Sequence, residues 1–140
     1  MSLSSIFAAI SASGFARDLV STLSKTGAGA QVAVRGAAGS VPAFLCAHLH
    51  LKRRGSDETG PIFALLPNAD DAAYFCSDLQ QILNEEDSVL LFPPSDNRPY
   101  DSEHVPDPAP VIERGDVLQR LKEGFNGILV SRIDAVFEKV

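Results

Sequence analysis

The sequence contains no tryptophan, one methionine and only two cysteines in 140 residues. Cys46 and Cys76 both lie in apolar, helical contexts and are too few for a disulfide framework, which favours a reducing cytoplasm. Basic residues are also scarce, because 12 lysines and arginines stand against 18 aspartates and glutamates, a formal net charge of −6. A domain that binds duplex DNA by itself normally carries a net basic face, so the composition argues against autonomous DNA binding.

Long apolar runs and a secretory signal are absent as well. No apolar run approaches the roughly 18–20 residues that a membrane-spanning helix needs. The first twelve residues, MSLSSIFAAISA, lack the basic start of a secretory signal. We therefore expect no membrane partner. With 45% hydrophobic and 21% charged residues, the chain has the composition of one soluble globular domain with an apolar core.

Four short apolar runs predict buried strands, and they are Gln31–Val34, Ile62–Leu66, Val89–Phe92 and Gly127–Val130. They lack polar alternation, which is typical of strands that are covered on both faces. Helical patterns separate these runs, and such alternation predicts an α/β fold with a parallel sheet between two helical layers. We expect residues 31–140 to form this three-layer lobe and residues 1–30 to form a helical segment that packs on it.

The helical patterns have recognisable boundaries. Two short helices are expected on either side of Ser13-Gly14, a third over Val41–Arg54, and a fourth that is capped by Asn68. Two more are expected over Val111–Glu123 and Ile133–Val140. The residues expected on the buried faces of these last two helices are Val111, Leu118 and Leu121, and Ile133, Val136, Phe137 and Val140.

The turn from Gly36 to Ala43, GAAGSVPA, lies between the first predicted strand and the next helix, where a phosphate-binding loop would lie. In the pattern GxxxxGK[ST], glycines let backbone N–H groups surround the phosphates, lysine reaches the terminal phosphates and the hydroxyl holds magnesium. Here Val41, Pro42 and Ala43 occupy the second-glycine, lysine and hydroxyl positions, and Pro42 also lacks an N–H. We interpret the turn as a degenerate phosphate loop that binds no nucleotide. The residues that make it up are Gly36, Gly39, Ser40, Val41, Pro42 and Ala43.

No metal site or catalytic residue is predicted. Cys46, His48 and His50 would converge on a strand, but on the predicted helix their side chains point in different directions. His104 stands alone in a proline-rich segment, and the spacings of zinc sites are missing. No serine or cysteine lies in a GxSxG turn.

Two groups of charged residues are interpreted as structural rather than functional. The segment between Phe92 and Pro110 is too rich in proline for a helix, and its acidic residues are interpreted as a solvated loop. These residues are Asp96, Asp101, Glu103 and Asp107. Lys52, Arg53 and Arg54 complement the dipole at the end of a helix, which is favoured over contact with phosphate.

Taken in order, four segments resemble the N-terminal end of the bacterial transcription-repair coupling factor family and, more distantly, the damage-recognition helicase excinuclease B. They are GAAGSVPAFL, LLPNADDAAYFCSDL, LLFPPSDNRPYD leading to PVIERGDVLQRL, and GILVSRIDAVFEKV. The match runs from about Val34 to Val140, and the Phe-Pro…Pro-Tyr-Asp segment followed by an Ile-x-Arg helix contributes most to it. The resemblance implies a RecA-like, P-loop-NTPase-like lobe that has lost ATP binding. We expect Arg98, Tyr100 and Asp101 to form an ordered structural loop.

The same resemblance implies a function for a longer protein. Such a protein displaces stalled RNA polymerase from damaged DNA and recruits repair through excinuclease A. ATP, magnesium and duplex DNA would then be bound by other lobes, and this segment would be a noncatalytic scaffold that contacts other domains of the same chain. Because the chain ends inside a helical pattern, we expect it to be a piece of a longer polypeptide. Two alternatives stay open: an active ATP-binding helicase lobe, and an independent flavodoxin-like domain for ligand binding or signalling.

Overall fold

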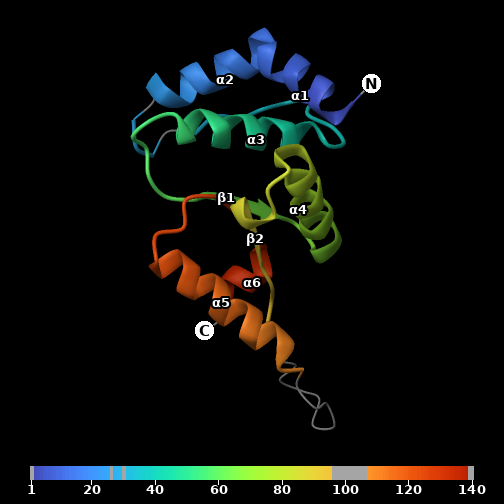
Figure 1. Ribbon diagram of the computed structural model, residues 1–140, viewed down its shortest axis with the longest axis vertical. Coiled ribbons are helices and arrows are strands. Elements are labelled where there is room, and N and C mark those ends of the chain that lie inside the picture. Colours follow the sequence, from blue (N-terminus) through green and yellow to red (C-terminus); the bar gives the residue numbers. More distant parts are fainter. Residues whose placement is uncertain (1, 26, 30, 96–106, 139–140) are drawn as a thin grey trace.

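The computed structural model describes residues 2–25, 27–29, 31–95 and 107–138. Its elements are α1 (Leu3–Ala12), α2 (Gly14–Lys25), α3 (Val41–Arg54), β1 (Ile62–Leu66), α4 (Ala69–Leu83), the short 3-10 helix η1 (Glu86–Ser88), β2 (Val89–Phe92), α5 (Ala109–Lys122), β3 (Ile128–Arg132) and α6 (Ile133–Phe137). Figure 1 shows them in their arrangement along the longest axis.

The three strands form one parallel sheet in the order β1-β3-β2. Ile62 of β1 and Val89 of β2 both lie opposite Ile128 of β3, so the central strand is the last in sequence. The chain crosses β3 to pass from β1 to β2 and then returns to the centre. Two crossovers of the same hand in opposite directions place their helices on opposite faces, which is how α4 and α5 come to enclose the sheet. The predicted α/β fold with a parallel sheet is confirmed.

The first face of the sheet carries the larger core. Its buried residues come from α3, α4, β2 and β3, and they are Ala43, Ala47, Ala72, Cys76, Leu79, Val89, Ile128 and Val130. Ile62, Ala64 and Leu66 of β1 pack against this cluster. Leu79, Ile128 and Val130 are fully buried. The buried members of this cluster are all apolar.

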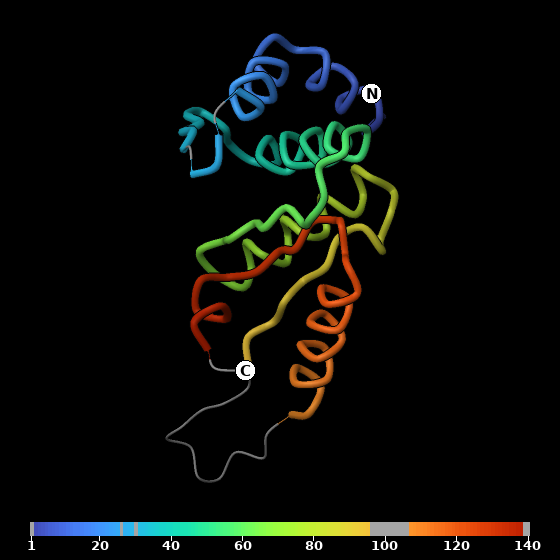
Figure 2. The backbone as a smooth tube through the Cα atoms, turned by 90° about the vertical axis from the view of Figure 1, so that its left-hand side faces the viewer, coloured from blue at the N-terminus to red at the C-terminus, as the bar shows by residue number. Residues whose placement is uncertain are grey.

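The second face carries a smaller core under α5 and α6. Its buried residues are Phe92, Leu129, Val117 and Ala135. Figure 2 shows α5 running alongside β2, on the side of the molecule away from α1 and α2. Helices therefore lie on both faces of the sheet, so the molecule has three layers with the sheet in the middle.

The two N-terminal helices lie over α3 (Figure 1). Ser2 caps α1 by accepting a hydrogen bond from the Ser5 N–H at 3.2 Å, and Ser13 separates α1 from α2. The ring of Phe7 stacks on that of Phe44 in α3, with centroids 6.3 Å apart. The division around Ser13-Gly14 that the sequence predicts is confirmed. Among the described residues no single helix has the length and apolar character to cross a bilayer, and only the pair α1 and α2, bent by 59°, meets these criteria jointly.

The predicted first strand is wrong. Residues 31–35 form neither helix nor strand, and Val32 and Val34 are 36% and 38% exposed. The Gly36–Ala43 turn therefore does not follow a strand of the sheet. A run of residues that favour strands forms one where it can pair with a neighbouring strand and become half-buried. Residues 31–35 pair with none of the three strands.

Three further expectations need correction. Strand β1 alternates between half-buried and exposed residues instead of being covered on both faces. In α5 the exposed fraction is 62% for Val111 and 37% for Leu118, whereas Arg114 and Val117 are buried. The last helix ends at Phe137, and Ile133, Val136 and Phe137, which are expected on its buried face, are exposed, whereas Ala135 is buried; Val140 lies outside the described residues.

Candidate functional site

The turn before α3 has a phosphate-loop outline but few free donors. Gly36 and Gly39 adopt left-handed backbone angles, with φ of 78° and 58°. The Val41 N–H donates to the Ala38 carbonyl at 3.2 Å, and Pro42 has no N–H. Two of the leading amide positions of α3 therefore cannot face an anion. The Ser40 side chain makes no capping hydrogen bond.

An open pocket of about 400 Å³ adjoins this turn, at the carboxyl end of β1. It is lined by Gly39, Ser40 and Pro42 of the turn, Leu66 of β1, and Asp71, Tyr74, Phe75 and Asp78 of α4. Two carboxylates thus border the space beside a would-be phosphate loop, and none of the described lining residues is basic. A triphosphate would meet like charge there without a compensating lysine.

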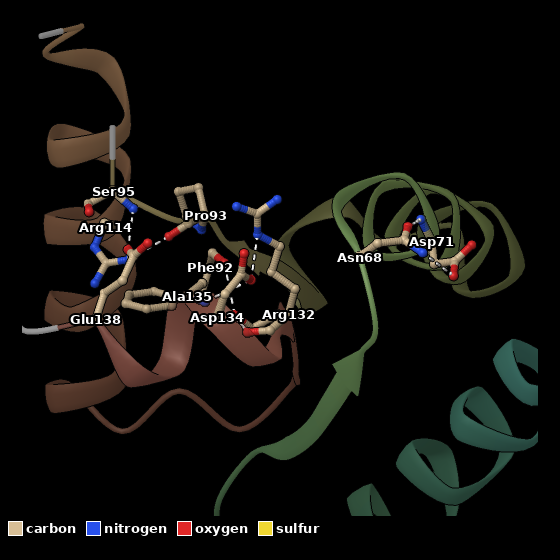
Figure 3. Close-up of polar contacts among 11 residues, drawn as sticks. Asn68, Asp71, Phe92, Pro93, Ser95, Arg114, Arg132, Asp134, Ala135 and Glu138 are labelled. Atoms are coloured by element: carbon tan, nitrogen blue, oxygen red, sulfur yellow. Dashed lines mark hydrogen bonds and ion pairs between the residues drawn. The ribbon is translucent and has the colours of Figure 1, made fainter. Parts of the chain in front are cut away.

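Asp71 has a local structural partner. Its N–H donates to Asn68 Oδ1 at 2.8 Å, and Asn68 Nδ2 donates to its carboxylate at 2.8 Å (Figure 3). The predicted cap of α4 by Asn68 is confirmed. This reciprocal pair fixes the start of the helix and holds one of the two carboxylates in place.

A second polar cluster surrounds the buried Arg114 on the other side of the sheet (Figure 3). Arg114 Nη1 donates to the Pro93 carbonyl at 2.7 Å and lies 3.2 Å from Glu138 Oε2. Its guanidinium stacks 4.4 Å from the centroid of the Phe92 ring. The same Glu138 oxygen accepts from the Ser95 N–H. One buried cation therefore joins the end of β2, helix α5 and the residue after α6.

The sequence indicates Arg114 only through the Ile-x-Arg motif and predicts that other residues form the buried face of α5. Its role depends on Glu138, which lies 24 positions away and whose pairing no local pattern reveals. Because the cluster holds Pro93 and Ser95, it fixes the backbone where the proline-rich segment begins. The Glu138 carboxylate is engaged by two donors, Arg114 Nη1 and the Ser95 N–H, whereas Arg114 Nη2 is buried without a partner among the described residues.

Cys46, His48 and His50 diverge on α3, as predicted. His48 lines a groove against α1, whereas His50 lines a pocket with Ser88 and Asn126 at the amino ends of β2 and β3. Burial raises the pKa of Cys46 to about 12 and raises that of Cys76, which disfavours the reactive thiolate form of both. No group of three or more candidate metal ligands occurs within the described ranges.

Burial also perturbs the two histidines. Desolvation, followed by the charge of Lys52, lowers the pKa of His48. Desolvation lowers the pKa of His50 too, with Arg54 and Arg53 acting in the same direction and Glu85 opposing them. Both imidazoles are therefore neutral at pH 7.

The basic residues at the end of α3 make local ion pairs. Arg53 Nε lies 3.0 Å from Glu58 Oε2, and Arg54 Nη1 lies 2.9 Å from Glu85 Oε2. Glu85 also accepts from the Ser88 hydroxyl at 2.6 Å, which with Arg54 lowers its pKa. This arrangement fits the predicted structural role of Arg53 and Arg54 better than a role in phosphate binding.

Several predicted residues lie outside the described residues. They are the structural-loop residues Arg98, Tyr100 and Asp101, together with Asp96, Glu103 and His104. Of the acidic group only Asp107 is described, and its carboxylate accepts from the Ala109 N–H at 3.0 Å at the start of α5.

The chain matches no protein-family model, no curated protein and no solved structure. The residues and geometry above are thus the basis for any functional assignment.

Proposed function

We propose that this chain is the noncatalytic N-terminal scaffold lobe of a transcription-repair coupling factor. The full-length protein would displace stalled RNA polymerase from damaged DNA and recruit the nucleotide-excision-repair machinery. In this proposal the lobe is RecA-like and cytoplasmic, and it contributes a rigid platform rather than chemistry.

The turn before α3 carries the noncatalytic part of the proposal, although it follows no strand of the sheet and so lacks the strand–loop–helix placement of a phosphate loop. It pairs two left-handed glycines with Pro42 and with an amide, Val41 N–H, that is already engaged. Asp71 and Asp78 line the adjoining pocket. A phosphate loop with its lysine and hydroxyl replaced and carboxylates beside it offers neither the charge nor the donors that a magnesium nucleotide needs.

The Arg114 cluster supports a scaffold role for a different reason. It ties the segment after β2 to α5 and to Glu138 through a buried cation. A platform for neighbouring domains must hold its connecting segments in fixed positions, and such a cluster does so without any reactive group. The motif that contains Arg114 also contributes most of the resemblance to the coupling factor family.

The partners follow from the same proposal. Other domains of the longer chain would pack on the lobe, and excinuclease A and RNA polymerase would be bound through those domains. ATP, magnesium and duplex DNA would be bound by motor lobes outside this segment, which agrees with a net charge of −6 here.

Calorimetric titration with magnesium ATP tests the loss of nucleotide binding. We expect no measurable heat of binding to this chain at millimolar nucleotide, and the double variant Val41→Gly/Pro42→Lys serves as a partial reconstruction of the loop. Micromolar binding by the unmodified chain would contradict the proposal and favour the active helicase lobe.

A repair assay tests the cellular role. In cells that lack the native gene, we expect repair of the transcribed strand to lose its advantage over the other strand. The gene without the codons for this lobe should express a protein that still hydrolyses ATP. Unchanged strand preference after deletion of the whole gene would refute the assignment, and submicromolar binding of this chain to duplex DNA in a gel shift at physiological salt would refute the scaffold role.

A further inference from the structure

Strand β1 lies at one edge of the sheet, and within the described residues no strand pairs with its outer side. The Ile62 N–H donates to the Gly127 carbonyl at 2.9 Å, next to the first residue of β3. Because successive backbone N–H groups of a strand point to opposite sides, the N–H and carbonyl groups of Phe63 and Leu65 point away from β3. Such a row of unpaired backbone groups is a template for a further strand.

The opposite edge of the sheet has the protection that β1 lacks. Strand β2 is followed directly by Pro93 and Pro94, which have no N–H to donate to a neighbouring strand. The five residues of β1, IFALL, include neither a proline nor a charged side chain. Phe63 and Leu65 are also half-exposed on the side that α5 and α6 leave uncovered. Pairing with an added strand is therefore favoured at β1 and disfavoured at β2.

Two open pockets adjoin β1, one at each end, and neither is lined by a residue of β2 or β3. The pocket at the amino end has a volume of about 430 Å³ and also includes Lys52, which disfavours a basic ligand there. Its apolar wall consists of Val20, Leu23, Leu49 and Ile62. The pocket at Leu66 has a volume of about 400 Å³ and contains Asp71 and Asp78. Side chains of a strand added to the edge are therefore able to reach one apolar and one acidic pocket.

The acidic pocket selects the sign of the charge that enters it. Asp78 is half-buried, and among the described residues its carboxylate has no hydrogen-bond or ion-pair partner. Tyr74, which is 73% exposed, lies one helical turn from both Asp71 and Asp78 and lines the same pocket. A lysine or arginine side chain in this pocket gains an opposite charge and an aromatic ring to lie against.

We propose that the outer edge of β1 binds an extended segment of a partner protein as a fourth strand. The backbone of this segment pairs with Phe63 and Leu65, an apolar side chain enters the pocket at Ile62, and a lysine or arginine enters the pocket at Leu66. Because Ile62 and Leu66 are about 13 Å apart on one face of β1, the two side chains of the partner are four positions apart. The partner residues that face the opposite side are apolar and cover Phe63 and Leu65. This inference is independent of the proposed scaffold function.

Fluorescence anisotropy of labelled peptides titrated with the whole chain tests the proposal. The peptides Ser-Gly-Leu-Val-Thr-Val-Lys-Gly-Ser and Ser-Gly-Lys-Val-Thr-Val-Leu-Gly-Ser fit a strand parallel and a strand antiparallel to β1, respectively. We expect one of them to bind with a dissociation constant on the order of 100 μM. The control, Ser-Gly-Val-Thr-Leu-Lys-Val-Gly-Ser, has the same composition without the pattern and should bind at least about tenfold more weakly. Binding of neither patterned peptide, or equal binding of all three, would overturn the proposal.

Hydrogen exchange followed by NMR locates the bound peptide. At about 1 mM peptide, ten times the expected dissociation constant, the amides of Phe63 and Leu65 should exchange about tenfold more slowly, whereas those of α5 should not change. Protection elsewhere without protection of these two amides would place the peptide at another site. Sedimentation of the chain alone should show a monomer up to about 200 μM. Self-association that slows exchange of the same two amides would make a second copy the occupant and refute a partner protein.

Three variants separate the edge from the acidic pocket. Leu65→Pro removes an N–H that points away from β3, so it leaves the ladder with β3 intact and should weaken peptide binding at least about tenfold. Asp78→Asn should weaken binding about threefold, as should glutamine in place of the peptide lysine. Asp116→Asn on α5 removes the same charge from an exposed position elsewhere and should leave the affinity unchanged. The proposal fails if Leu65→Pro binds as tightly as the unmodified chain, or if Asp78→Asn has no larger effect than Asp116→Asn.

Discussion

The two faces of the small parallel sheet are closed in different ways. On the first face eight buried apolar residues from helices and strands form one cluster, and β1 contributes three more side chains to it. On the second face the buried cluster has four members, and Arg114 lies beside it over the ring of Phe92. Phe63 and Leu65 of β1 are 47% and 49% exposed on that side.

The difference shows what a three-stranded sheet can and cannot bury. Helices α3 and α4 together supply enough apolar surface to cover one face of all three strands. On the other face α5 and the five-residue α6 reach β2 and β3 but leave one side of β1 uncovered. The second face gains order from a buried cation and its acceptors, whose strength depends on geometry more than on area.

Removing apolar volume from the first face should have the largest effect. Leu79 of α4 is fully buried in the larger cluster. We expect Leu79→Ala to lower the free energy of unfolding by about 4 kcal/mol, since it removes buried methyl groups and leaves a cavity. Urea unfolding followed by circular dichroism measures this. Leu121→Ala on α5, whose side chain packs against the smaller cluster, is the matched comparison, and a loss as large there would mean that the second face is as tightly closed as the first.

Loss of the buried cation should come next. We expect Arg114→Met to cost about 2 kcal/mol, because the Pro93 carbonyl and Glu138 lose their donor although Glu138 stays partly hydrated. Arg120→Met is the control, since Arg120 also lies over an aromatic ring, that of Phe125, but its side chain is 39% exposed, against 6% for that of Arg114. Urea midpoints compare the two. If both variants lose equally little, the Arg114 cluster does not stabilise the second face.

The same contrast explains which elements the sequence predicts. Helix α3 begins and ends where Pro42 and Gly55 indicate, and α4 begins at Asn68, because these signals are local. The buried face of α5 is not predictable in this way. An arginine at position 114 is assigned to solvent by any pattern of hydrophobicity, and it is a core residue because of partners distant in sequence, the Pro93 carbonyl, the Phe92 ring and Glu138.

The candidate site shows a similar limit. The mismatch of Val41, Pro42 and Ala43 with the glycine, lysine and hydroxyl of the phosphate-loop pattern is visible in the sequence alone. The carboxylates of Asp71 and Asp78 beside the same turn are not, since the fold brings α4 to it. The prediction of a strand over Gln31–Val34 was wrong, because an apolar sequence alone does not provide a neighbouring strand to pair with.

Acidification should weaken the first face selectively. His48 and His50 have lowered pKa values in the fold, so the unfolded chain binds more protons than the folded chain as pH falls through about 6.5. Stability is complete above that pH and declines below it, by at most about 1.4 kcal/mol per pH unit for each histidine. Unfolding free energies between pH 7 and 5 measure the slope.

A variant isolates this effect. His48→Gln/His50→Gln should flatten the slope and retain His104, whose contribution is then measured directly. Glu85 has a lowered pKa, so its stabilising effect is lost only at pH values below about 4.5, outside this window. An equal slope in the double variant would show that the buried histidines do not govern it.

The uncovered side of β1 gives the smallest expected effect and the sharpest comparison, because one strand serves both faces. Phe63→Ser should cost about 1 kcal/mol or less, since half of the ring is already in water, whereas Leu66→Ser, on the side that packs on the larger cluster, should cost about 2 kcal/mol. Urea unfolding at two protein concentrations measures both. Equal losses, or a Phe63→Ser loss that grows with concentration, would mean that this side of β1 is covered in solution and that the two faces are more alike than the fold indicates.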